Sequence, residues 1–228
     1  MIYYDITDYV SNSDLSEFDK LLHNKADFGG DKEKIFAFGN LVDALISEPD
    51  LVDMENKTVT DAHGEILHFT EEEWQQAQRM KHSALKNPLV NLLVQSMEFQ
   101  VVAMNPEFEI NCEYAHFFIP ARGKADGIAA AIKTGMDLKT TACVTKESFL
   151  NSIDLFSYDR QAAWYMDLFK LDKFIFVGIS KKMNKDRSHE IFIHAVERGD
   201  VMYSLGLKKY QKLAYQYKTM ILDLWPAG

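Results

Sequence analysis

The chain has 228 residues, of which 47% are hydrophobic and 26% are charged, with 34 acidic against 25 basic residues. This composition is typical of one globular domain with a sizeable core and argues against a disordered or membrane-spanning protein. The net charge of −9 argues against a general nucleic-acid coat, because neutralising phosphates requires clustered Lys and Arg. The two cysteines are too few for a four-thiolate metal site, and no secretion signal is recognisable, so we expect a soluble cytoplasmic protein with reduced thiols.

The first hundred residues are mainly helical in pattern. Cap-forming residues precede amphipathic stripes, and three glutamates after Thr70 suit the positive end of a helix dipole. Pro49 ends the second helical segment, and Pro88 breaks or kinks the third. We expect irregular structure over residues 24–34 and 50–70, and helices over residues 13–23, 35–47 and 70–87.

The second half alternates between strand and helix patterns. Short apolar runs separated by Pro, Gly and Lys-Thr-Gly predict three consecutive antiparallel strands, and two more strands and three helices follow. The expected strands cover 108–119, 124–132, 134–140, 173–182 and 189–197, and the expected helices cover 146–156, 158–169 and 201–225. This order predicts an α/β or α+β fold, with a central mixed sheet flanked by helices. We expect a single domain over 1–228, with a helical part (1–100) before the core (101–228).

Charged residues converge in the apolar stretch Gly123–Thr141. If a hairpin turns at about Lys133 to Gly135, Asp126 and Asp137 lie near each other at one end of the sheet. Period-two alternation places Lys139 on the same face as Asp137, whereas Leu138 points into the opposite, apolar layer. The sequence therefore predicts two carboxylates and one ammonium in one place.

This combination suits hydrolysis of a phosphodiester. Two neighbouring carboxylates are costly unless a cation compensates them, and oxygen ligands suit Mg²⁺ or Mn²⁺. A lysine beside such an ion can orient or help deprotonate water and stabilise charge on a phosphate. The alternative is an edge-strand salt bridge between Asp137 and Lys139, and the residues alone do not decide between the two.

The motifs resemble a known family. An Asp on one strand followed by D-x-K on the next resembles the PD-(D/E)XK nuclease superfamily, and Gln161 and Tyr165 look like the Q-x-x-x-Y element of its RecB-like branch. The chain is also similar, over nearly its full length, to phage RecE-type exonucleases (exodeoxyribonuclease VIII). That similarity rests on the order of SNSDLS, FGNLVDALISEPD, GKADGI, MDLKTTA, YDRQAAWY and the closing Trp225-Pro226.

The resemblance implies roles for individual residues in a restriction-endonuclease-like core. Asp126 and Asp137 would be metal ligands, Lys139 the catalytic lysine and the Leu138 carbonyl an additional ligand. Gln161 and Tyr165 would line the site and contact the DNA or its scissile phosphate. Their alternative is an ordinary half-buried helix face.

The chain departs from the family pattern in the second helix, where G-x-x-x-H is replaced by GNLVD with Asp43. Asp43 could still ligate the ion, or could be a helix-surface residue. The resemblance also implies an acidic ligand from the strand before the first Asp. Glu109 and Glu113 are both available and, being four residues apart, point to the same side of a strand, so alternation does not choose between them; we slightly favour Glu109. We expect His82 to face solvent or cap its helix.

Several further residues have two open interpretations. The basic side chains Arg122, Lys124, Lys133 and Arg160 form either a local rim that meets DNA or a solvated face. Residues 181–187 predict a charged hairpin turn, and the heptad-spaced Tyr203, Tyr210 and Tyr217 favour a core or a subunit interface over a stacking platform.

The resemblance implies a Mg²⁺-dependent deoxyribonuclease, with Mn²⁺ as a substitute, that digests double-stranded DNA from an end, 5′ to 3′, in phage-type recombination. It also implies a homo-oligomeric ring around DNA and a single-strand annealing protein as partner. The alternatives are an endonuclease or junction resolvase on the same fold, a catalytically decayed DNA-binding module, and a hydrolase of small phosphate esters.

Overall fold

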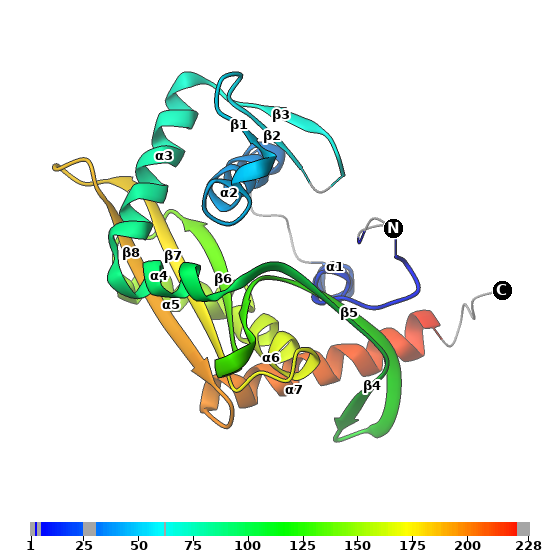
Figure 1. Ribbon diagram of the computed structural model, residues 1–228. Coiled ribbons are helices and arrows are strands. Elements are labelled where there is room, and N and C mark those ends of the chain that lie inside the picture. The colour runs from blue at the N-terminus through cyan, green and yellow to red at the C-terminus, as the bar shows by residue number, and fades with distance from the viewer. Residues whose placement is uncertain (1–2, 4–5, 25–30, 62, 223–228) are drawn as a thin grey trace.

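A five-stranded mixed sheet organises the computed structural model, which describes residues 3, 6–24, 31–61 and 63–222 (Figure 1). In spatial order its strands are β4 (Glu98–Cys112), β5 (Ala115–Ala129), β6 (Thr134–Thr141), β7 (Lys173–Met183) and β8 (His189–Glu197). All neighbours are antiparallel except β6 and β7, which are parallel. The predicted mixed sheet flanked by helices is confirmed.

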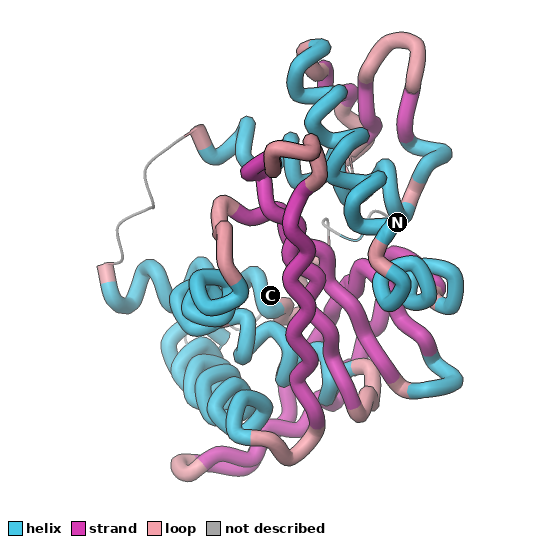
Figure 2. Tube along the Cα trace, turned by 90° about the vertical axis from the view of Figure 1, so that its left-hand side faces the viewer, coloured by secondary structure: helices cyan, strands magenta, loops and turns pink. Residues whose placement is uncertain are grey.

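Helices cover both faces of this sheet, so that the strands form the middle layer (Figure 2). One face packs against α2 (Lys32–Ser47), α3 (Glu71–Lys86) and α4 (Pro88–Ser96), and the other against α1 (Asn12–His23), α5 (Lys146–Leu155), α6 (Tyr158–Leu168) and α7 (Val201–Tyr217). Two clusters of buried apolar side chains fill the two interfaces. No helix among the described residues is long and apolar enough to cross a membrane.

Helix starts follow the capping residues in the sequence. Ser11 and Thr70 each form a capping box, with Asp14 and Glu73 respectively, at the beginnings of α1 and α3. The break expected at Pro88 separates two helices, because Asn87 ends α3 and also caps α4. α7 continues as a π-helical turn over Lys218–Leu222; Trp225, Pro226 and residues 25–30 of the expected loop lie outside the described residues.

The expectation of one strand over residues 108–119 is wrong. β4 ends at Cys112, the chain reverses at Glu113 and Tyr114, and β5 begins at Ala115. This two-residue turn contains none of the Gly, Asn, Asp or Pro residues that usually mark a hairpin. Apolar residues on both sides of it therefore looked like one continuous strand.

Two other boundaries also differ from expectation. Residues 50–70 contain a small antiparallel sheet of β1 (Val52–Asp53), β2 (Thr58–Thr60) and β3 (Ile66–His68), whose strands are too short to show alternation. The β5–β6 hairpin turns through a 3₁₀ segment at Ala130–Ile132 and the left-handed Lys133, slightly before the expected position. The hairpin itself is confirmed.

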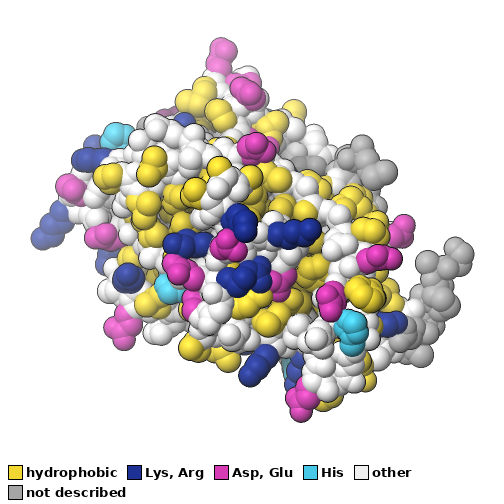
Figure 3. Space-filling model, turned by 60° about the horizontal axis from the view of Figure 1, so that its bottom comes forward, with side chains coloured by type: hydrophobic (Ala, Val, Ile, Leu, Met, Phe, Trp, Pro, Cys, Tyr) yellow, Lys and Arg dark blue, Asp and Glu magenta, His cyan; other side chains and the backbone are white. Residues whose placement is uncertain are grey.

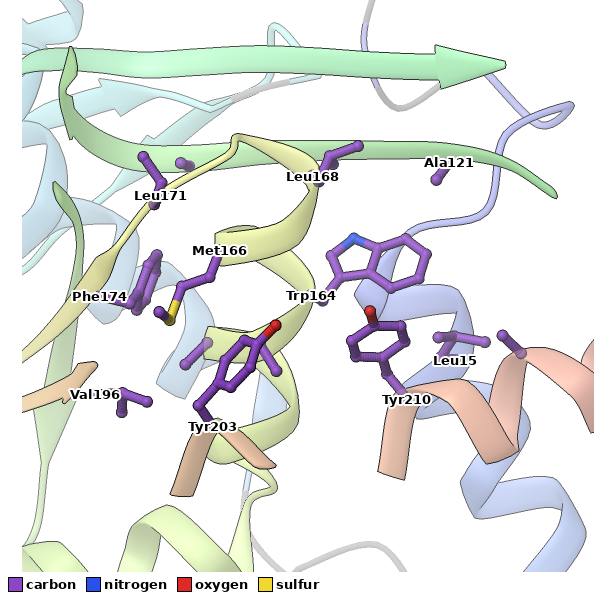
Figure 4. Close-up of a cluster of buried hydrophobic side chains, with 14 of the residues drawn as sticks. Leu15, Ala121, Trp164, Met166, Leu168, Leu171, Phe174, Val196, Tyr203 and Tyr210 are labelled. Atoms are coloured by element: carbon purple, nitrogen blue, oxygen red, sulfur yellow. The ribbon is translucent and has the colours of Figure 1, made fainter. Parts of the chain in front are cut away.

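Tyr203 and Tyr210 of α7 belong to the core, which is one of the two interpretations that their spacing favoured (Figure 4). The rings of Trp164 and Tyr210 are nearly perpendicular, with centroids 5.5 Å apart. The hydroxyl groups of Tyr203 and Tyr210 donate to Asp167 at 2.8 and 2.6 Å. Their polar ends are therefore satisfied inside the packing between α6 and α7.

A test of this packing uses Gly206, which lies where α7 passes α6. A Cβ at this position would overlap the backbone carbonyl of Asp159, which cannot rotate away. We expect Gly206→Ala to destabilise the fold by about 3 kcal/mol, in the range for overpacked cores, as measured by chemical denaturation. Leu205→Ala, at a half-exposed neighbour, is the control. An unchanged denaturation midpoint for Gly206→Ala would contradict this packing.

Candidate active site

The candidate site lies where β5 and β6 separate. Their ladder runs from Ala129 and Thr134 to Gly127 and Met136 and then stops. The next residues on the two strands are Asp126 and Asp137. The strands therefore open directly beside the two carboxylates, and groups from both faces of the sheet can reach this gap.

Hydrogen bonds hold these carboxylates toward β6 and α6. Asp126 Oδ2 accepts a hydrogen bond from the backbone N–H of Leu138 at 2.9 Å, which takes the place of a ladder bond. Asp137 Oδ1 accepts from Lys139 Nζ at 2.9 Å and from Gln161 Nε2 at 2.6 Å. The structure thus brings together Asp126, Asp137, Leu138, Lys139 and Gln161.

Lys139 is partly exposed, and Asp137 is almost fully buried. The two side chains are 24% and 5% exposed, and Nζ also lies 2.7 Å from Asp137 Oδ2. Burial, the largest single influence, would lower the pKa of Lys139, but the charge of Asp137, smaller contributions from Tyr158 and Asp126 and the hydrogen bond to Asp137 together outweigh it, so the pKa is raised. The amine is therefore held in its charged form, with the ring of Tyr158 at 5.0 Å from Nζ.

A third carboxylate approaches from α2. Ser47 Oγ donates to Asp43 Oδ1 at 3.1 Å, and Gln100 Nε2 donates to Asp43 Oδ2 at 3.2 Å. Desolvation raises the pKa of Asp43 to about 6, with a further contribution from the charge of Asp137. The pKa of Asp126 is also raised, first by desolvation and then by the charges of Asp137 and Asp43. The three acids therefore repel one another.

The burial of Asp43, with the repulsion from Asp137, predicts a pH dependence of stability. A carboxyl group whose pKa rises on folding stabilises the folded state while it is protonated. For Asp43 this contribution is complete below the unfolded-state pKa of 3.8 and is lost as the pH rises through the folded-state pKa of about 6. At Asp43 the loss of stability is about 2 kcal/mol between pH 4 and pH 7. We expect Asp43→Asn to stabilise the metal-free protein at pH 7 but not at pH 4, as measured by denaturant titration. Equal effects at both pH values would contradict this.

A cleft of about 540 Å³ opens beside these groups, between α2, the β1–β3 sheet and β4–β5. Its lining includes Asp43, Gln100, Lys124 and Asp126. Phe36 and Asn40 lie on the same side of α2 as Asp43, at helical spacing. The size falls within the usual range for ligand pockets.

The residues present suit a hard divalent cation. Asp137 Oδ2 is buried and accepts no hydrogen bond within the described chain, although the ammonium of Lys139 is near it. In a strand, the N–H and C=O of one residue point to the same side, so the Leu138 carbonyl faces the same gap as its N–H. All these donors are oxygens, as Mg²⁺ prefers. Among the described residues, however, no three His, Cys, Asp or Glu side chains lie close enough together to form a metal cluster.

The structure does not bring Glu109 or Glu113 to this site. Glu109 pairs with Phe118 and lies 3.0 Å from His116 near the tip of the hairpin. Phe118 is eight residues from Asp126, or roughly 26 Å along an extended strand. Glu113 forms the hairpin turn itself. The expectation for Glu109 rested on the resemblance, which implies an acid on the strand before Asp126, and we do not retain Glu109 as a ligand.

The ring of Tyr165 packs from α6 against two strands of the sheet. A Cβ at Gly123 would lie 2.9 Å from the Tyr165 ring, so the ring packs directly on the backbone of β5. It also stacks on Phe174 of β7, with centroids 5.7 Å apart. Of the two Q-x-x-x-Y residues, Gln161 contacts Asp137, and Tyr165 positions β5, the strand that carries Asp126.

The expected basic rim is only partly present. Arg122 is buried and donates to the backbone carbonyl of Tyr9 at 3.0 Å, and Arg160 is buried and donates to Asn12 Oδ1 at 3.1 Å. These two arginines hold the N-terminal segment and α1, which the sequence pattern could not show. Lys133 is exposed beside Asp172. On the face in Figure 3, basic and acidic side chains are interspersed rather than forming one basic field.

Comparison with known proteins decides the family. A family model described as a PDDEXK-like domain of unknown function matches residues 9–223. The chain belongs to this family. The resemblance to the PD-(D/E)XK superfamily is therefore confirmed, and the PDDEXK-like chain carries its carboxylates and lysine at the opening between β5 and β6. A search of curated proteins finds no match.

Solved structures share the fold at low sequence identity. A candidate exonuclease from Eubacterium rectale is 14% identical, with a TM-score of 0.60 over 93% of this chain and 82% of that one. A phage-related exonuclease from Haemophilus somnus is 14% identical, with a TM-score of 0.44 over 94% and 85% of the two chains. An alkaline exonuclease from Laribacter hongkongensis is 10% identical, with a TM-score of 0.39 over 97% and 94%. The first of these likenesses supports the nuclease fold.

Proposed function

We propose that this PDDEXK-like protein is a metal-dependent deoxyribonuclease that digests duplex DNA from an end. The observation that carries the proposal is the pairing of Lys139 with Asp137, next to Asp126, at the opening of the sheet. Membership of the PDDEXK-like family supports a nuclease. The 5′ to 3′ direction, the recombination role, the ring and the annealing partner rest on the resemblance to RecE-type exonucleases.

In this proposal Asp126, Asp137 and the Leu138 carbonyl would hold Mg²⁺ or Mn²⁺. When bound, such an ion lowers the pKa of water and neutralises charge on the phosphate. Lys139, kept protonated beside Asp137, donates hydrogen bonds to the attacking water or to the phosphate oxygen on which charge develops. Gln161 fixes the orientation of Asp137 through its bond to Oδ1.

The direct test uses end-labelled linear duplex and a covalently closed circle of the same sequence, each with Mg²⁺ or Mn²⁺. We expect nucleotides to be released progressively from linear DNA, beginning at the 5′ ends, while the closed circle stays intact. Asp137→Asn, purified identically, controls for a contaminating nuclease.

Four outcomes would overturn parts of this proposal. Cleavage of the closed circle would indicate an endonuclease, and release from the 3′ ends would contradict the direction. Absence of hydrolysis with both ions would refute the nuclease and favour a DNA-binding module. Faster turnover of a small aryl phosphate than of DNA would indicate a phosphate-ester hydrolase.

A further inference from the structure

Gln100 has an unusual backbone for a residue in a strand. Its φ angle is 53°, in the left-handed region that a residue with a Cβ rarely adopts. Gln100 lies in β4, next to the strand that carries Asp126. Such outliers persist where the surrounding structure enforces them, and they gather at functional sites.

The ladder between β4 and β5 is interrupted at this residue. Phe99 pairs with Gly127 and Val101 pairs with Ala125, so Gln100 and Asp126 face each other without forming a pair. The interruption frees both side chains from the regular alternation of the strands. Asp126 turns to the backbone of Leu138 in β6, and Gln100 turns to Asp43 in α2.

The contacts of Asp43 differ from those of Asp137. Both oxygens of Asp43 accept from neutral donors, the Ser47 hydroxyl and the Gln100 amide. Asp137 instead pairs with the charged Lys139. Neutral donors orient a carboxylate without cancelling its charge, so the charge of Asp43 stays available to a cation.

We propose that Gln100 is a positioning residue that holds Asp43 on the cleft beside Asp126, so that Asp43 reaches a divalent cation bound by Asp126. This inference rests on the proposed function for the identity of the site. Gln100 and Asp43 both line the cleft that reaches Asp126, which places them on the path to the ion.

The test measures Mn²⁺ affinity by calorimetry in the full-length protein. Gln100→Met keeps the length of the side chain and removes the amide, and we expect it to weaken Mn²⁺ binding about 10- to 100-fold, as the loss of a supporting hydrogen bond does at metal sites. We expect kcat on linear DNA to fall while KM for DNA stays constant. Lys170→Met is the matched control, because Lys170 also has a left-handed backbone (φ 57°) far from these acids in sequence.

Two further variants keep the test decisive. Gln100→Gly suits the left-handed backbone and also removes the amide, so it replaces Gln100→Met if the latter does not fold. If Gln100 acts through Asp43, adding Gln100→Met to Asp43→Asn should weaken Mn²⁺ binding no further than Asp43→Asn does. Wild-type affinity in Gln100→Met, or losses that add in the double variant, would overturn the inference.

The calorimetry separates this inference from the proposed function. If Mn²⁺ binding depends on Gln100 and Asp43 but the wild-type protein releases no nucleotides, the nuclease is refuted and the positioning role stands. Nuclease activity in wild type, together with unchanged Mn²⁺ affinity in both Gln100 variants, would refute the positioning role and leave the nuclease standing. A wild-type protein that binds no Mn²⁺ would overturn the positioning role.

Discussion

Lys139→Met is expected to lower the rate of DNA hydrolysis by about 10²- to 10⁴-fold, the range for removing one catalytic proton donor or charge stabiliser. The ammonium is the cation that the structure places directly against Asp137 Oδ1 and Oδ2. Methionine fills similar space but carries no charge and donates no hydrogen bond. The measurement is nucleotide release from linear duplex at saturating Mg²⁺.

Two controls separate lost chemistry from lost folding. Removing the ammonium leaves the buried Asp137 with the Gln161 amide, so the metal-free variant should also unfold at a lower temperature. Mg²⁺ should restore part of that loss but not the activity. Lys208→Met, at an exposed lysine on α7, should change neither property. Activity in Lys139→Met equal to wild type would remove the lysine from the mechanism.

Asp126→Asn is expected to abolish hydrolysis and at the same time to stabilise the metal-free protein. The asparagine oxygen can still accept the Leu138 N–H, so the local hydrogen bond survives. The substitution removes a desolvated charge that Asp137 and Asp43 repel, as the raised pKa of Asp126 indicates. We expect Tm at pH 8 without metal to rise by several degrees, since each kcal/mol corresponds to about 2–4 °C in a chain of this size.

The sign of this stability change is informative. A residue needed only for the fold would lower Tm when it is replaced, whereas a functional carboxylate held against repulsion raises it. Added Mg²⁺ should stabilise wild type and leave Asp126→Asn unchanged. Asp172→Asn is the matched control, because Asp172 is exposed beside Lys133 and should affect neither property. A lower Tm for Asp126→Asn would show that its charge supports the fold.

The part of this site that the sequence predicts is the part governed by local periodicity. Alternation along β6 placed Asp137 and Lys139 on one face and Leu138 in the opposite layer, and a hairpin was enough to bring Asp126 near them. Helix caps such as Ser11 and Thr70 are equally local, so helix starts were predicted to within a few residues. Fold class followed from the order of these elements.

What the sequence could not predict depends on contacts between distant residues. The left-handed backbone of Gln100 occurs where the ladder between β4 and β5 is interrupted, and glutamine carries no local signal for it. The burial of Arg122 and Arg160 depends on the N-terminal segment and α1, which lie more than a hundred residues earlier in the chain. The turn at Glu113 and Tyr114 lacks turn-forming residues, so nothing in the sequence indicated that Glu109 lies near the tip of a hairpin.

The central claim is that Asp126 and Asp137 share one divalent cation at the opening between β5 and β6. Anomalous diffraction from crystals soaked in Mn²⁺ tests it most directly, because the ion itself is located. The account predicts a peak in contact with Asp126, Asp137 and the Leu138 carbonyl, and its loss in Asp126→Asn. A Mn²⁺ peak away from these groups, or an empty gap at saturating Mn²⁺, would contradict it.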